Sequence, residues 1–166
     1  MSRRIRRRSF TTKERILFAE EHGRTCSICK KEGLMFVSEI KEKLLSEGKY
    51  VFTLPDGSEV VSAAYFDDPL MKDKAANIDH KTPLSRGGTD ESSNLQLLCR
   101  ACNLSKNNQT MEEFKWRIYC EENVNDTAKE FANKFDLSRE EVVYFFRGKD
   151  KVKTFEFMQK LIRSVE

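Results

Sequence analysis

Four of the five cysteines occur as two pairs with identical spacing. Cys26 and Cys29 form one Cys-x2-Cys pair, and Cys99 and Cys102 form the other after a gap of 69 residues. Such a pair turns both sulfurs toward one point, so two pairs predict a tetrahedral zinc site that is structural because protein atoms fill every position. Redox chemistry or unmetallated buried thiols are the less favoured interpretations, and Cys120 is left over.

The segment between the two cysteine pairs contains the best candidate for acid–base chemistry. The chain has only two histidines. His22 lies in the last turn of an expected helix, where the helix dipole favours it for structural reasons. His80 follows Asp79 directly in a polar stretch, and it is therefore the only plausible imidazole base. We expect a hydrogen bond between one ring nitrogen and Asn94 or a backbone carbonyl to orient the ring.

Residues 78–106, together with the first cysteine pair, resemble the HNH endonuclease family in its zinc-knuckle form. The shared features are the Asp79-His80 pair, Pro83, a Gly-Gly turn, Asn-Leu before the second cysteine pair and Asn103 directly after it. Each element alone is weak, but together and in this order they are specific. The resemblance covers about a fifth of the chain and implies the ββα-metal fold.

The resemblance implies metal-dependent hydrolysis of DNA phosphodiester bonds, leaving 5′-phosphate and 3′-hydroxyl ends. Asp79 and Asn103 would bind one catalytic Mg²⁺ or Mn²⁺ ion, since oxygen donors suit these hard cations. His80 would activate water as the general base, and Asn94 would brace the loop. The family name expects a histidine at the position of Asn103, but many members of the family carry asparagine there. Lys106, one helical turn later, would contact a DNA phosphate or remain a solvated lysine.

A protein of another class competes with this interpretation. It is a non-catalytic, zinc-stabilised DNA-binding or adaptor protein. The complete set of Asp79, His80, Asn94 and Asn103 favours the nuclease, because a pure binder has no reason to keep it. A restriction, homing or phage-encoded role is not specified by these residues.

The positive charge is concentrated at the start of the chain. Residues 1–31 hold ten Lys or Arg and three acidic residues, whereas residues 32–78 have a balance of −4. No apolar run is long enough for a membrane span, and none follows the basic start as a secretory signal requires. We therefore expect an intracellular protein, in the cytoplasm or nucleoid, whose thiols are reduced. A basic arm at residues 1–10 could track DNA or stay solvated; its arginines are Arg3, Arg4, Arg6, Arg7 and Arg8.

The remaining pattern predicts an α+β fold with a zinc-stapled ββα core at residues 11–122, which carries an inserted helix and hairpin at about 34–76. A helical module follows at residues 123–166. The expected elements are a helix capped by Thr11 or Thr12 through about His22, a helix at 38–47, a hairpin around residues 55–58, strands at 77–80 and 94–98, helix starts at 110, 126 and 138, and a helix at 151–165.

For the helical module, a bundle that packs on the core, or an element that forms a homodimer, is the favoured interpretation. A helix-turn-helix is less favoured. Asp136 occupies the turn position that usually takes glycine, and Glu140 and Glu141 lie near the start of the supposed recognition helix, where DNA phosphates disfavour acids. The aromatic residues of this region are expected to fill the module's core.

Overall fold

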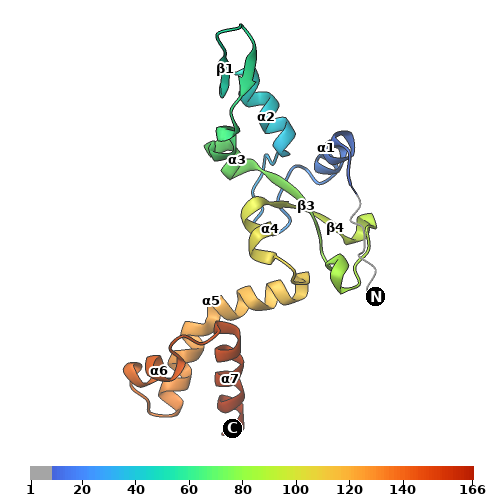
Figure 1. The fold of residues 1–166 in the computed structure, drawn as a ribbon. Helices are drawn as coiled ribbons and strands as arrows, with labels where there is room; N and C mark the ends of the chain where they lie inside the picture. The colour runs from blue at the N-terminus through green and yellow to red at the C-terminus, as the bar shows by residue number, and fades with distance from the viewer. Residues whose placement is uncertain (1–8) are drawn as a thin grey trace, which may run out of the picture. The chain divides into compact units, whose positions relative to one another are not determined.

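The computed structural model describes residues 9–166, so the predicted arginine arm lies outside the described residues. The chain divides into two compact units, Met1–Thr110 and Met111–Glu166 (Figure 1). The domain boundary predicted at residue 122 lies inside the single helix α5 (Met111–Lys134). The predicted helix start at Asp126 is wrong for the same reason: α5 contains neither glycine nor proline, so nothing interrupts its backbone hydrogen bonds.

The first unit opens with helix α1 (Thr12–Glu21), whose predicted cap at Thr11 is confirmed. The backbone N–H of Glu14 donates to the Thr11 hydroxyl at 3.2 Å, and the backbone N–H of Thr11 donates to the Glu14 carboxylate at 2.8 Å. This reciprocal pair satisfies two donors that the helix leaves free. Gly23, at φ +58°, then takes the left-handed conformation that ends the helical segment.

Two short antiparallel strands and the helix after them form the centre of the first unit. β3 (Ala76–His80) pairs with β4 (Leu95–Cys99), and α4 (Arg100–Lys106) follows β4 directly. The predicted ββα order is therefore present. Side chains alternate along a strand, so Ala76, Ile78 and His80 share one face of β3 while Asp79 lies on the other.

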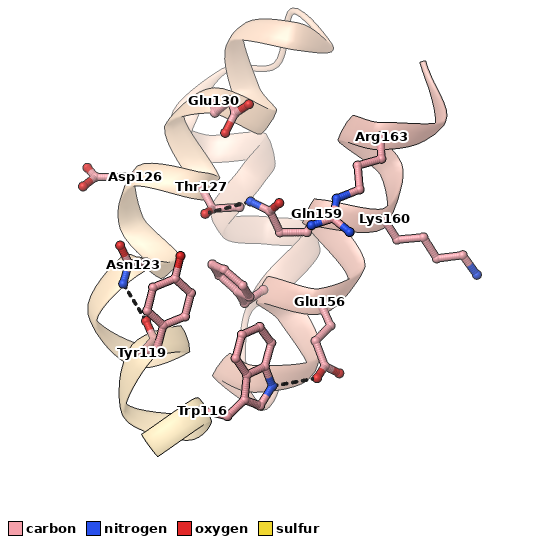
Figure 2. Close-up of a pocket in the computed structure, with 11 residues that line it drawn as sticks. Trp116, Tyr119, Asn123, Asp126, Thr127, Glu130, Glu156, Gln159, Lys160 and Arg163 are labelled. Atoms are coloured by element: carbon pink, nitrogen blue, oxygen red, sulfur yellow. Dashed lines mark hydrogen bonds between the residues drawn. The ribbon is translucent and has the colours of Figure 1, made fainter. Parts of the chain in front are cut away.

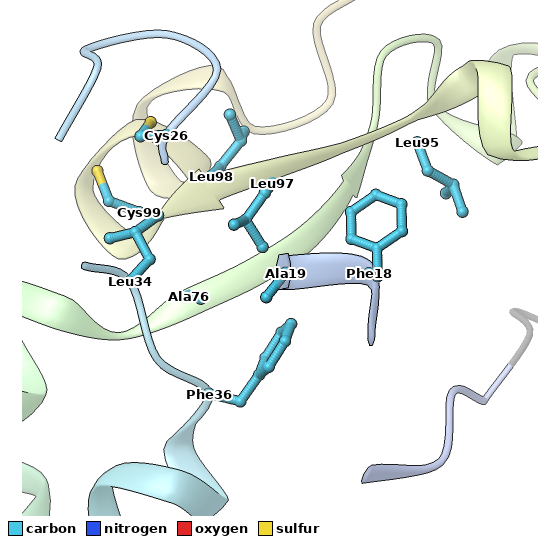
Figure 3. Close-up of a cluster of buried hydrophobic side chains, with 10 residues drawn as sticks. All are labelled: Phe18, Ala19, Cys26, Leu34, Phe36, Ala76, Leu95, Leu97, Leu98 and Cys99. Carbon is cyan, nitrogen blue, oxygen red and sulfur yellow. The ribbon is translucent and has the colours of Figure 1, made fainter. Parts of the chain in front are cut away.

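A buried apolar cluster packs against the first of these two faces. It joins α1, the loops on either side of the first cysteine pair, and both strands (Figure 3). The cluster fixes the strands against α1, because burying this apolar surface stabilises their packing. Its members are Phe18, Ala19, Cys26, Leu34, Phe36, Ala76, Leu95, Leu97, Leu98 and Cys99.

The expected helix and hairpin lie between α1 and β3. The elements are α2 (Val37–Ser46), β1 (Val51–Thr53) paired with β2 (Glu59–Val61), the 3-10 helix η1 (Ala63–Asp67) and α3 (Pro69–Lys74). They have a small core of their own, formed by Ile40, Leu44, Met71 and Ala75. This second core lets the segment fold beside the strands without contributing to the first cluster.

The second unit consists of α5, α6 (Arg139–Phe146) and α7 (Lys151–Ser164). α5 packs along α7, and Phe131, Met158 and Ile162 form the buried centre of the unit. The predicted start at Ser138 is confirmed by a capping box with Glu141. Asp136 adopts φ +51° in the turn before it, a conformation that aspartate tolerates better than most residues.

The expectation that the aromatic residues of this unit fill its core is only partly correct. Phe131 and Phe155 are buried, but Trp116 and Tyr119 are about half exposed. They line a groove of about 630 Å³ between α5 and α7, where the Trp116 indole N–H donates to Glu156 at 3.1 Å (Figure 2). A unit of three helices buries too few positions to enclose every ring. In the described part of the chain, no helix combines the length and apolarity that crossing a bilayer requires.

Candidate active site and metal centre

The two cysteine pairs meet at one point of the first unit. All four Sγ atoms lie within 4.8 Å of one another, and the Sγ atoms of Cys29 and Cys99 are 3.7 Å apart. Tetrahedral zinc with Zn–S bonds of about 2.3 Å requires sulfur separations of about 3.8 Å. The four thiols therefore have the spacing of a site that could hold zinc.

Local hydrogen bonds explain how pairs so distant in the sequence come together. Cys99 ends β4, and the loop that carries Cys26 joins the same strand where the Ser27 N–H donates to the Leu97 carbonyl at 2.9 Å. A tight turn closes the first pair, since the Lys30 N–H donates to the Cys26 carbonyl at 3.1 Å. The strand thus brings the second pair to the first.

The thiols strongly affect one another. Burial acts to raise the pKa of Cys26, but backbone hydrogen bonds at Cys99 and Cys29 outweigh it and lower this pKa to about 7. The pKa of Cys102 is raised by burial, by hydrogen bonds with Cys99 and Cys29 and by the charge on Cys26. One thiolate therefore forms easily while another is suppressed, a conflict that a bound cation would remove.

His80 ends β3 and is almost fully buried, with 5 % of its surface exposed. Its Nε2 lies 2.8 Å from Oδ1 of Asp90. The expectation that Asn94 or a backbone carbonyl orients the ring is therefore wrong, because the loop after the strand brings a carboxylate to this nitrogen. Asp90 was missed because nothing in the sequence shows how that loop folds back.

Asn94 makes three hydrogen bonds to the loop that carries Asp90. Its Oδ1 accepts from the Thr82 N–H at 2.9 Å, and its Nδ2 donates to the carbonyls of Thr82 and Thr89 at 3.0 and 2.8 Å. Gly88 must be glycine here, since a Cβ would lie 1.9 Å from the Thr82 carbonyl oxygen. The amide thus clamps both sides of the loop.

Asp79 lies on the opposite face of β3 from His80 and is held by two donors. Its Oδ2 accepts from Lys106 Nζ at 3.0 Å and from Nε2 of Gln96, its partner across the strands, at 2.9 Å. Lys106 Nζ also donates to the His80 carbonyl at 2.8 Å. Lys106 has no exposed surface, so the expectation that it contacts a DNA phosphate is wrong: its ammonium is used inside the protein.

Asn103 lies in α4, one helical turn before Lys106, and is half-buried. Residues three apart share a helix face, and Lys106 points from this face to Asp79. Asn103 is therefore on the side of α4 that faces Asp79.

A small hollow of about 170 Å³ adjoins His80 on its own face of β3. Phe10, Phe36 and Ile78 supply its apolar wall, and Arg15 of α1 its cation. Arg15 is exposed and donates from Nε to the Phe10 carbonyl at 3.2 Å. The sequence analysis did not single out Arg15, because only the packing of α1 on the strands brings it to this hollow.

Comparison with known families finds a match that covers β3, β4 and α4. Residues 67–109 match the family model described as HNH endonuclease. This segment is an HNH domain. The resemblance inferred from the sequence is confirmed, and the match supports a nuclease-type function. No curated protein and no solved structure matches the chain.

Within the HNH domain, Lys106 has an unusual role for a lysine, since lysine is almost never fully buried unless it is paired. We expect Lys106→Met to destabilise the protein by about 3 kcal/mol, because it leaves the Asp79 charge buried without its partner. Urea unfolding checks this value. The matched control is Lys72→Met, whose ion pair with Asp67 is exposed and contributes about 0–1 kcal/mol. Equal stabilities of the two variants would contradict the buried pair.

Proposed function

We propose that this protein is a metal-dependent endonuclease that hydrolyses DNA phosphodiester bonds and leaves 5′-phosphate and 3′-hydroxyl ends. The observation that carries the proposal is the buried His80 imidazole, fixed by the Asp90 carboxylate within a segment that matches the HNH family model. A histidine without an acid–base role has no need of such an arrangement at the end of a strand, next to a hollow that a small anion could enter.

The pairing with Asp90 determines which nitrogen of His80 does the chemistry. A carboxylate accepts hydrogen bonds, so Nε2 carries the proton and Nδ1 is the basic nitrogen. Nδ1 takes a proton from the attacking water, which then displaces the 3′ oxygen at phosphorus. The imidazole becomes positively charged in this step, and the Asp90 carboxylate, 2.8 Å away, stabilises that charge.

Asp79 and Asn103 would hold the catalytic Mg²⁺ or Mn²⁺ ion, because carboxylate and amide oxygens suit such cations. When bound, the ion would neutralise charge on the departing oxygen. Lys106 and Gln96 both donate to Oδ2 of Asp79, which leaves Oδ1 for the metal. Since Lys106 already compensates this carboxylate, we expect weak metal binding that strengthens when a substrate phosphate completes the shell. The Cys26, Cys29, Cys99 and Cys102 cluster would hold a separate, structural Zn²⁺.

Arg15 would bind the substrate phosphate beside the base. Its guanidinium lines the hollow next to His80, and a guanidinium pairs well with phosphate oxygens. The arginines of the basic arm would add contacts along the DNA backbone.

The test is incubation of purified protein with supercoiled plasmid and Mg²⁺ or Mn²⁺, with and without a chelator. We expect nicked or linear product only with free metal, and end sequencing should find 5′-phosphates. A mock preparation from cells without the protein excludes a contaminating nuclease. DNA binding without cleavage under every metal condition would instead favour the non-catalytic, zinc-stabilised binding protein.

Asp90→Asn tests the positioning of the base. The amide can donate to Nε2 and so favour the other ring tautomer, with the proton on Nδ1, where the base is needed. We expect kcat to fall by about 10²-fold while KM and zinc content stay unchanged, as measured by steady-state cleavage. Glu91→Gln, an exposed acid next in the same loop, is the control and should cut normally. A rise in KM alone would place Asp90 in substrate binding.

A further inference from the structure

The junction between α6 and α7 exposes large aromatic side chains to solvent. Tyr144 is 82 % exposed and Phe145 57 %, both in the last turn of α6, and Phe157 of α7 is 50 % exposed. Exposing these rings to water is unfavourable, because each ring has a large apolar surface. They are therefore unlike the buried rings at the centre of the same unit.

Four basic residues alternate through the same junction. They are Arg147, Lys149, Lys151 and Lys153, all exposed, and none forms an ion pair within the described chain. Asp150 is the one acid between residues 142 and 155. Its carboxylate caps α7, accepting from the backbone N–H groups of Val152 and Lys153 at 2.9 and 3.1 Å. The junction thus keeps a net positive charge.

Phe157, Lys149 and Lys153 share one hollow of about 390 Å³, and Tyr144, Phe145 and Arg147 flank its Phe146 in the sequence. Phe146 and Phe157 line it with ring centroids 6.1 Å apart, beside Lys149, Lys153 and Asp150. Lys149 Nζ lies 5.9 Å from the centre of the Phe146 ring. A ligand that combines flat aromatic groups with negative charge would satisfy both kinds of side chain.

The groove between α5 and α7 makes a useful contrast within the same unit. It also presents aromatic side chains, Trp116 and Tyr119, but three acids, Asp126, Glu130 and Glu156, outnumber the two cations that line it, Lys160 and Arg163 (Figure 2). Acids repel phosphate, so the acidic excess makes this groove suit a nucleic acid less well than the junction does. The junction, by contrast, does not suit the centre of a protein interface, which would bury several lysines without partners.

We propose that the junction surface, formed by Tyr144, Phe145, Arg147, Lys149, Lys153 and Phe157, binds an unpaired strand of DNA. The rings would stack on bases and the basic side chains would contact phosphates, the combination that characterises single-strand binding. An intact duplex hides the faces of its bases, so exposed rings gain most from an unpaired segment. This inference rests on the proposed function only in taking DNA as the substrate.

The experiment measures binding alone, with the full chain carrying His80→Ala so that no strand is cut. Fluorescence anisotropy follows a labelled single-stranded oligonucleotide and the matching duplex. Tyr144→Ala with Phe145→Ala should weaken single-strand binding by about tenfold per ring that stacks. Lys149→Ala with Lys153→Ala should flatten the dependence of log K on log salt by about 0.7 for each phosphate that the variant no longer neutralises.

Tyr119→Ala is the control, because it removes a half-exposed ring from the groove between α5 and α7; it should leave the affinity unchanged. Circular dichroism checks that each variant is folded. Unchanged affinity in both double variants, or an equal loss on duplex and single strand, would overturn the proposal. A change of mass in solution with unaltered DNA affinity would overturn it too and assign the surface to a second copy. A parent protein that binds single strands through the junction but never cuts would contradict the nuclease function alone.

Discussion

Replacing His80 with alanine is expected to slow plasmid cleavage by about 10²- to 10⁴-fold, the usual effect of losing a general base. His80 is the one imidazole beside Asp79, and its ring is already fixed by Asp90. Zinc content, folding and DNA binding should remain, since the four clustered cysteines and the Lys106 contacts are untouched. Steady-state cleavage, elemental analysis, circular dichroism and anisotropy measure the cleavage rate, zinc content, folding and DNA binding separately.

Asn103→Ala provides the contrast that identifies the role of His80. It removes a proposed metal ligand, so higher Mn²⁺ concentration should restore part of its activity. No metal concentration should restore His80→Ala, because a missing proton acceptor is not replaced by more cation. Since His80 is almost buried, His80→Asn serves as a second variant that leaves a smaller cavity. Cleavage near the wild-type rate by both histidine variants, with a mock preparation inactive, would refute the mechanism.

The elements that the sequence predicted well are those defined by local rules. The Thr11 and Ser138 caps each need only a hydroxyl and an acid three residues later. The pairing of β3 with β4 follows from two short apolar runs that flank a glycine-rich turn. The cysteine cluster followed from spacing alone, because each pair is a local turn and the strands determine only how the two pairs meet.

The parts that sequence reasoning missed depend on contacts between distant segments. Lys106 was expected at the surface, as most lysines are, yet Asp79 and the His80 carbonyl offer it two acceptors inside. Asp90 and Arg15 reach His80 only after the loop and α1 have packed. The rings of Tyr144 and Phe145 were expected in a core but are exposed. Hydropathy indicates that such rings favour burial, but it does not show how much apolar surface a unit of three helices can cover.

One consequence of these contacts links the two faces of β3. His80 and Asp79 are neighbours in the sequence but point to opposite sides of the strand, so neither directly positions the other. Lys106 bonds to both, to the backbone of one and to the carboxylate of the other. The Lys106 ammonium therefore fixes the end of β3. It keeps a constant distance between the proposed base, His80, and the proposed metal ligand, Asp79.

Replacing Cys99 with serine is expected to release the zinc and unfold the first unit. Structural zinc sites contribute about 10–16 kcal/mol in small peptides, comparable to the whole stability of a typical domain, about 5–15 kcal/mol. Cys99 also belongs to the apolar cluster that holds the strands to α1. The helical signal of residues 111–166 should persist in part, because that unit has its own buried centre.

Elemental analysis and circular dichroism, with and without a strong chelator, measure this effect. Cys120→Ser is the control: Cys120 is equally buried but lies in α5, outside the cluster of four. It should keep one zinc per chain and lose only about 1–3 kcal/mol for its buried hydroxyl. A wild-type protein that contains no zinc and stays folded in chelator would show instead that the four thiols stabilise the fold by packing alone.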